Sequence, residues 1–146
     1  MEVINFITKM IIKIFLLFVM LFITSVSKAD TTDFWHIYIN DSIFQKSGQG
    51  SEGEVIVIKR EDIGDADVLG VRHYDDTPCY DCTVALVIRD IGGLEVKHIN
   101  GSDGDLLKVT FKELLAISEK NNSDRFLFSF YEDDKLRRHL FTLKIE

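Results

Sequence analysis

The stretch that decides the fold is "FLFSFY" (residues 126–131), the turn residues Asp133 and Asp134, and "HLFTLKI" (residues 139–145). Alternate residues of the first segment are phenylalanines, and alternate residues of the second continue the pattern: Phe126, Phe128 and Phe130, then His139, Phe141, Leu143 and Ile145. Apolar residues at period two indicate strands with one buried face. Aromatic residues at this spacing are more typical of a core than of a ligand groove. We therefore predict a hairpin that packs its phenylalanines into the core.

The segments before this hairpin are also short and apolar, with turn residues between them. We expect strands at Phe34–Ile39, 43–46, 54–59, Val68–Tyr74, 83–89 and 94–99. Within residues 83–89, Val84, Leu86 and Ile88 share one face. The segment 54–59 is apolar on both faces, which predicts a central strand.

One segment carries a helical pattern. "TFKELLAISEKNN" (residues 110–122) opens with Thr110 and Glu113, the spacing of a capping box, in which each side chain binds a free backbone N–H group. Further along, Phe111, Leu114, Leu115 and Ser118 share one face at helical spacing. We predict one short helix here.

Eight or nine short strands with a single helix predict an all-β fold: a two-sheet antiparallel sandwich, immunoglobulin-like or related. The only proline is Pro78, so no proline-rich linker divides the chain. We expect residues 30–146 to form a single β-sandwich domain.

The N-terminal segment is typical of a secretory signal peptide. Lys9 and Lys13 precede the apolar run "IFLLFVMLFI", and Ser27 and Ala29 provide small residues before a cut at Asp30. The alternative, a retained membrane anchor, is less favoured because the run is shorter than the roughly 20 residues that span a bilayer. We expect residues 1–29 to be removed and the protein to be exported, to the periplasm or the extracellular space.

The charge of the chain is −7, and the leader carries three lysines and one glutamate, so its removal changes the net charge to −9. A domain this acidic repels the phosphate backbone, and no basic stripe offsets the repulsion, so we do not expect nucleic acid as a partner. Such charge first of all keeps a protein soluble. A basic protein surface or a cation is the better candidate for a partner, and no membrane contact is expected after cleavage.

Both cysteines lie in "HYDDTPCYDC" (residues 73–82), which raises three possibilities: a redox centre, half of a metal site, or a structural disulfide. A redox centre needs its thiol at a helix N-terminus, whereas the residues after Cys82 predict a strand. The three aspartates around the pair also raise a thiol pKa: Asp75, Asp76 and Asp81. We therefore expect no reactive thiolate.

A structural zinc site commonly has four ligands. His73 and Asp76 are near the cysteines, while His36, His98 and His139 are scattered and no second ligand cluster appears. In an oxidising compartment the favoured prediction is a local Cys79–Cys82 disulfide, with no metal and no cofactor.

The sequence favours neither a calcium site nor a catalytic centre. Asp65, Asp67, Gly70 and Asp76 match an EF-hand count, but Leu69 takes a ligand position and no flanking helices are expected. The neighbouring acids Glu61 and Asp62, and likewise Glu132 and Asp133, would point to opposite faces of a strand. No catalytic motif is present, although a Ser/His/Asp set assembled only by folding stays open.

The sequence therefore favours a non-catalytic binding module whose partner is another protein, bound through loops or a sheet edge. A more specific alternative is an inhibitor or immunity-type protein whose acidic surface blocks a basic secreted enzyme. A third alternative, from another class, is a small metal- or thiol-dependent enzyme that uses Cys79 and Cys82.

Overall fold

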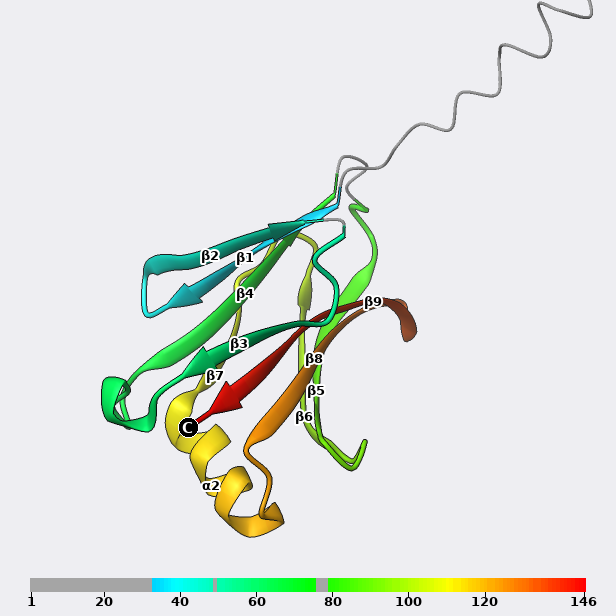
Figure 1. Cartoon of the computed structure of the whole chain (residues 1–146). Helices are drawn as coiled ribbons and strands as arrows, with labels where there is room; N and C mark the ends of the chain where they lie inside the picture. Colours follow the sequence, from blue (N-terminus) through cyan, green and yellow to red (C-terminus); the bar gives the residue numbers. More distant parts are fainter. Residues whose placement is uncertain (1–32, 49, 76–78) are drawn as a thin grey trace, which may run out of the picture. The chain divides into compact units, whose positions relative to one another are not determined.

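The fold is seen in a computed structural model that describes residues 33–48, 50–75 and 79–146. The described part contains nine strands, a short 3-10 helix and an α-helix (Figure 1). In chain order they are β1 (Phe34–Ile39), β2 (Ser42–Gly48), β3 (Glu54–Ile58), η1 (Arg60–Asp62), β4 (Val68–Tyr74), β5 (Thr83–Asp90), β6 (Glu95–Ser102), β7 (Leu107–Thr110), α2 (Phe111–Asn121), β8 (Arg125–Glu132) and β9 (Lys135–Ile145).

The strands form two sheets, which confirms the predicted all-β sandwich with one short helix. One sheet has the order β2-β1-β4-β7, and the other has the order β3-β9-β8-β5-β6. In Figure 1 the two sheets face one another, and α2 lies at one end of them. Neighbouring strands are antiparallel except for β3 and β9, which run parallel.

The strand order resembles that of an immunoglobulin-type sandwich. In that fold, strands A, B and E share one sheet, and G, F and C share the other. Here β1, β4 and β7 occupy the first set of positions, and β9, β8 and β5 occupy the second. The chain differs in its core landmarks, because its tryptophan, Trp35, lies on β1 and its disulfide does not link the sheets.

The core is one cluster of apolar side chains from the inward faces of both sheets and from α2. The alternation in β1 is typical: Trp35 and Ile37 are buried, while Phe34, His36 and Tyr38 point the other way. The predicted inward residues of β5 and β8 are all buried, namely Val84, Leu86, Ile88, Phe126, Phe128 and Phe130. Period two therefore predicted the core of these strands correctly.

The prediction that residues 54–59 form a central strand is wrong. β3 is an edge strand of its sheet and, among the described strands, pairs only with β9. Ile56 and Ile58 are buried, but Val55 and Val57 are each about half exposed, at 49% and 48%. The pattern was ambiguous because an edge strand can also carry β-branched residues on its solvent face.

The sequence predicted that His139 and Phe141 share one face of β9, and this prediction is wrong. The register shifts between Phe128 and Ser129, so that Phe128 lies opposite Phe141 and Ser129 lies opposite His139. Leu140 is the extra residue of this β-bulge, and it is fully buried. This inserted residue reverses the side on which Arg138 and His139 point, and a second register shift lies between Phe130 and Tyr131, toward the start of β9.

The predicted helix and its capping box are confirmed in α2. Glu113 N donates to Thr110 Oγ1 at 3.2 Å, and Thr110 N donates to Glu113 Oε2 at 3.1 Å. Asn122 ends the helix in the left-handed conformation, with φ of 50°. The short strand β7 just before the helix was not predicted, because four residues are too few for a clear period.

The predicted signal peptide, residues 1–29, lies outside the described residues. Within the part of the chain that the structure describes, no helix is long and apolar enough to cross a membrane.

Candidate functional site

Several loops meet at the end of the sandwich that carries the cysteines, which we call the disulfide end. The register places Phe34 opposite both Gly48 and Tyr74, and it places Thr83 opposite Ser102. The two sheets meet at this end, since Arg138 of β9 bonds Asp33 beside β1. The described parts of the disulfide end are residue 33, residues 48 and 50–53, residues 75 and 79–82, residues 103–106, and residues 132–138.

Cys79 and Cys82 are joined by a disulfide, the pairing that the sequence predicts, with 5.4 Å between their Cα atoms. β5 begins at the next residue, Thr83, so neither cysteine lies at the N-terminus of a helix. The backbone N–H of Cys79 donates to the Asp103 carboxylate at 3.1 Å, which ties the disulfide loop to the β6–β7 turn. The disulfide and this bond are two constraints on the loop.

Carboxylates dominate the charge of the disulfide end. Its described residues include nine acids and three basic residues, so the acids outnumber the basic groups threefold. The acids are Asp33, Glu52, Asp75, Asp81, Asp103, Asp105, Glu132, Asp133 and Asp134, and the basic residues are Lys135, Arg137 and Arg138. The disulfide end is therefore strongly negative.

Two of the three basic side chains are already paired with acids of the same end. Arg138 donates to Glu52 at 2.7 Å and to Asp33 at 2.8 Å, and only 16% of its side chain is exposed. Arg137 pairs with Glu132. These ion pairs fix the loops around β9. Asp81 and Asp134, in contrast, are exposed and make no ion pair with any described residue.

A small pocket lies among these loops. Its volume of about 20 Å³ is enough for one water molecule. The lining residues are Asp33, His73, Asp75, Cys79, Val84, Asp103, Phe130, Glu132 and Arg137. The pocket is too small for an organic substrate, so it suits a water or an ion.

His73 is the most unusual side chain of this pocket. It is only 7% exposed and stacks on Phe130, with 4.2 Å between the ring centroids. Neither ring nitrogen has a hydrogen-bond partner among the described residues. Burial lowers the pKa of His73 below its usual value of 6.5, although the carboxylates of Asp33 and Asp75 act in the opposite direction.

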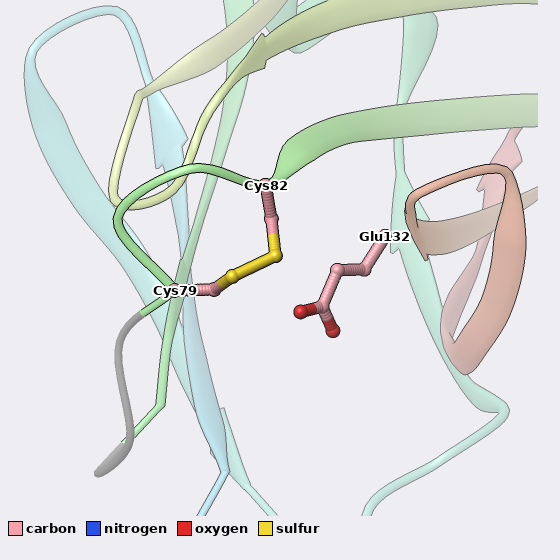
Figure 2. Close-up of side chains that lie close together, drawn as sticks. All are labelled: Cys79, Cys82 and Glu132. Carbon is pink, nitrogen blue, oxygen red and sulfur yellow. A yellow bond between two sulfur atoms is a disulfide. The ribbon is translucent and has the colours of Figure 1, made fainter.

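Glu132 brings a third potential metal ligand to the two cysteines. A carboxylate oxygen of Glu132 and the two sulfur atoms all lie within 4.8 Å of one another. Figure 2 shows the carboxylate turned toward the disulfide from the neighbouring hairpin. Sequence reasoning considered His73 and Asp76 but missed Glu132, because only the pairing of β8 with β5 brings it there.

The residues of the calcium hypothesis have other roles. The Asp67 carboxylate accepts hydrogen bonds from the backbone N–H of Gly64 at 2.7 Å and from the Asn40 amide at 3.1 Å. Gly70 lies within β4, and Asp65 is exposed in the connection before it. Asp76 lies outside the described residues. Asp67 thus stabilises a turn and joins two loops.

The acid pair Glu61 and Asp62 lies in η1 at the opposite end of the sandwich and is exposed. Glu132 and Asp133 also contact different parts of the structure. Glu132 lies beside the disulfide, while Asp133 accepts a hydrogen bond from Thr83 N at 3.2 Å. Neither pair converges on a common site.

Folding does bring one serine and one histidine together. Ser129 Oγ lies 2.9 Å from His139 Nδ1 across β8 and β9. Ser129 is completely buried, however, so its hydroxyl is closed to a substrate. The contact is a cross-strand hydrogen bond on the outer face of the sheet.

Sequence reasoning also missed an aromatic face on the outside of the four-stranded sheet. The Phe34 ring stacks on the Tyr74 ring, with 4.7 Å between the ring centroids, and the centroid of His36 lies 5.0 Å from that of Tyr74. The Arg72 guanidinium lies 6.0 Å from the ring centroid of Tyr38. Lys46 and Lys108 are exposed on the two outer strands of the same sheet. The signal was present in the alternation of β1, whose outward residues are all aromatic.

Comparison with known proteins adds no family to this description: no protein-family model matches the chain, and no curated protein matches it either.

Proposed function

We propose that the protein is an exported, non-catalytic binding module that uses its disulfide end to bind a basic surface on another protein. The observation that carries the proposal is the excess of carboxylates on loops that meet at this end. Loops held on a rigid scaffold are where binding residues are most often found. A surface of one sign also accelerates the encounter with a partner of opposite sign.

The loops are held in place before a partner arrives. The disulfide closes the loop before β5 on itself, and the Cys79–Asp103 and Thr83–Asp133 bonds each fix that region against another loop. Arg138 fixes two more through Asp33 and Glu52. Binding then orders few additional groups, and less of the interaction free energy is lost to entropy.

The more specific form of this proposal is an inhibitor or immunity-type protein that blocks a basic secreted enzyme. It rests on the same charge and adds a partner whose active-site cleft is basic. Nucleic acid fits the disulfide end poorly, because a phosphate backbone would meet carboxylates there.

The competing proposal is a small metal- or thiol-dependent enzyme using Cys79 and Cys82. It has less support, since the pocket beside the cysteines holds only about 20 Å³ and a strand follows Cys82. Turnover that depends on both cysteines would favour this alternative.

The experiment is capture from the exported fraction of the source cells, using three immobilised proteins. The first is the unaltered protein. The second neutralises exposed acids of the disulfide end (Asp81→Asn, Asp133→Asn, Asp134→Asn). The third is a matched control that neutralises three exposed acids of the opposite end (Glu61→Gln, Asp62→Asn, Asp65→Asn).

We expect the unaltered protein and the control to retain the same basic protein, and the disulfide-end variant to lose it. Mass spectrometry identifies the captured protein, and circular dichroism checks that the unaltered protein and both variants are folded. Equal capture by all three proteins, or capture of acidic proteins only, would contradict the proposal.

A further inference from the structure

We propose that reduction of the Cys79–Cys82 disulfide creates a Zn²⁺ site whose protein ligands are the two thiolates and the Glu132 carboxylate. This site needs no partner protein, so the inference stands apart from the proposed function. The oxidised protein has a structural disulfide at this position, and the reduced protein has a metal site.

The geometry of the three side chains suits this ion. Their ligand atoms lie within 4.8 Å of one another. Zn–S and Zn–O distances of about 2.3 Å and 2.1 Å in a tetrahedral site place ligand atoms roughly 3.5–3.8 Å apart. The sulfur atoms need only separate when their bond breaks, and Figure 2 shows the Glu132 carboxylate beside them.

The adjoining pocket supplies the fourth position. It is lined by both Cys79 and Glu132, and its volume of about 20 Å³ accommodates the water that would complete a tetrahedral site. His73 lines the same pocket, is 7% exposed, and has two ring nitrogens without a partner among the described residues. A buried imidazole that lacks a partner is costly unless a water or ion satisfies it.

The charges of the site also favour a divalent cation. Two thiolates and one carboxylate carry three negative charges, which Zn²⁺ reduces to one. The Arg137 guanidinium, paired with Glu132, offsets that remaining charge. The carboxylates of Asp33, Asp75 and Asp103 line the same pocket and attract cations. Thiolate ligands select zinc over magnesium or calcium.

The chemistry has two steps. In the first, a dithiol reductant transfers two electrons and two protons to the disulfide. The S–S bond breaks, each cysteine becomes a thiol, and the reductant is oxidised to its own disulfide. In the second step, Zn²⁺ displaces the two thiol protons and forms two Zn–S bonds. The nearby acids disfavour a free thiolate but not a metal-bound one.

The test uses the purified protein in oxidised form and after reduction with dithiothreitol, which is then removed under argon. Zn²⁺ is titrated against a chromogenic chelator, and Co²⁺ is added separately to detect sulfur-to-cobalt charge-transfer absorption. We expect one Zn²⁺ per reduced chain, the cobalt–thiolate band in the reduced form only, and no binding by the oxidised form.

Two variants test the ligand set. Glu132→Gln should weaken zinc binding by at least about tenfold, the effect usually seen even for residues that only support a ligand. Asp134→Asn removes the same charge from the same hairpin without removing a ligand, and should bind as the unaltered protein does.

Three results would overturn the inference: a reduced protein that binds no zinc, equal binding by the oxidised and reduced forms, or unchanged affinity in Glu132→Gln. Equal capture by all three proteins in the previous experiment would contradict the proposed function but leave these titrations unaffected, so the two proposals fail separately.

Discussion

His73 projects from β4 into a pocket that combines an apolar stack with charged groups. Phe130 covers one face of its ring, while Asp33, Asp75, Asp103 and Arg138 act on its charge. Desolvation has the largest effect and lowers the pKa of His73. The folded protein therefore holds this imidazole in its neutral form more strongly than the unfolded chain does.

This predicts a loss of stability on acidification. The unfolded chain takes up a proton as the pH falls through the usual value of 6.5, and the folded protein does so only at lower pH. Stability is thus present above 6.5 and lost below it, by at most about 1.4 kcal/mol between roughly pH 7.5 and pH 5.5 for one proton.

Urea unfolding of the unaltered protein and of His73→Gln at the two pH values measures this loss. The variant should lose less stability than the unaltered protein. His98→Gln, which changes an exposed histidine, is the control and should keep the full loss. An identical pH dependence in His73→Gln would show that other groups cause it.

Thr110 and Glu113 form the cap of α2. Lys97 donates to the Glu113 carboxylate at 2.6 Å and, together with bonds from Thr110, lowers the pKa of Glu113 to about 2. Glu113 is therefore ionised throughout the physiological range. The cap joins the helix to β6 as well as closing its first turn.

We predict that Thr110→Ala destabilises the protein by about 1 kcal/mol, because a helical N–H group loses its acceptor. Chemical denaturation measures the change in the free energy of unfolding. Thr110→Ser keeps the hydroxyl and should stay close to the unaltered protein. Equal losses in the two variants would mean that the methyl group, not the cap, carries the effect.

Strands at the edges of the sheets behave differently from those inside. β3 buries Ile56 and Ile58 but leaves Val55 and Val57 half exposed. Its parallel pairing with β9 also leaves its other side without a neighbouring strand in the described sheet. Only one face of β3 therefore contributes to the core.

Paired substitutions test this arrangement. Ile56→Ala should cost about 2–4 kcal/mol, since it opens a cavity in the core, and Val57→Ala should cost less than about 1 kcal/mol. Denaturant unfolding of the two variants gives the comparison. Similar losses in the free energy of unfolding at both positions would contradict the edge position of β3 and favour the central strand that the sequence predicted.

The turn between β4 and β5 is closed by the disulfide. We predict that the Cys79→Ser, Cys82→Ser double variant folds and loses about 2 kcal/mol, because so small a loop restricts the unfolded chain only slightly. Thermal and denaturant unfolding measure the loss, and capture of the partner should persist. A variant that fails to fold would show that the disulfide is required for the fold.

Local patterns predicted most strands, the helix and the disulfide, because alternation, capping and Cys spacing are properties of neighbouring residues. The bulge at Leu140 and the edge position of β3 depend on strand pairing, which one sequence does not reveal. For the same reason the sequence did not predict Glu132 beside the cysteines. The outward aromatic residues of β1 follow from its alternation, but their contacts with β4 depend on pairing. Long-range pairing builds this candidate site.

Charge is unevenly placed over the described protein. Acids outnumber basic groups threefold at the disulfide end, whereas Arg72, Lys46 and Lys108 accompany the aromatic side chains of the four-stranded sheet. A negative net charge spread evenly over the surface would need no explanation beyond solubility. Concentration of the acids on loops fixed by a disulfide and by ion pairs is what favours a binding role.

The most direct test is the affinity of the captured basic protein at about 50 mM and about 500 mM NaCl, where screening differs strongly. It is measured for the unaltered protein, the Asp81/Asp133/Asp134 variant and the Glu61/Asp62/Asp65 control. We predict strong, salt-sensitive binding by the unaltered protein and the control, and weak binding by the disulfide-end variant. Salt-independent affinity that is equal in all three proteins would contradict binding through the disulfide end.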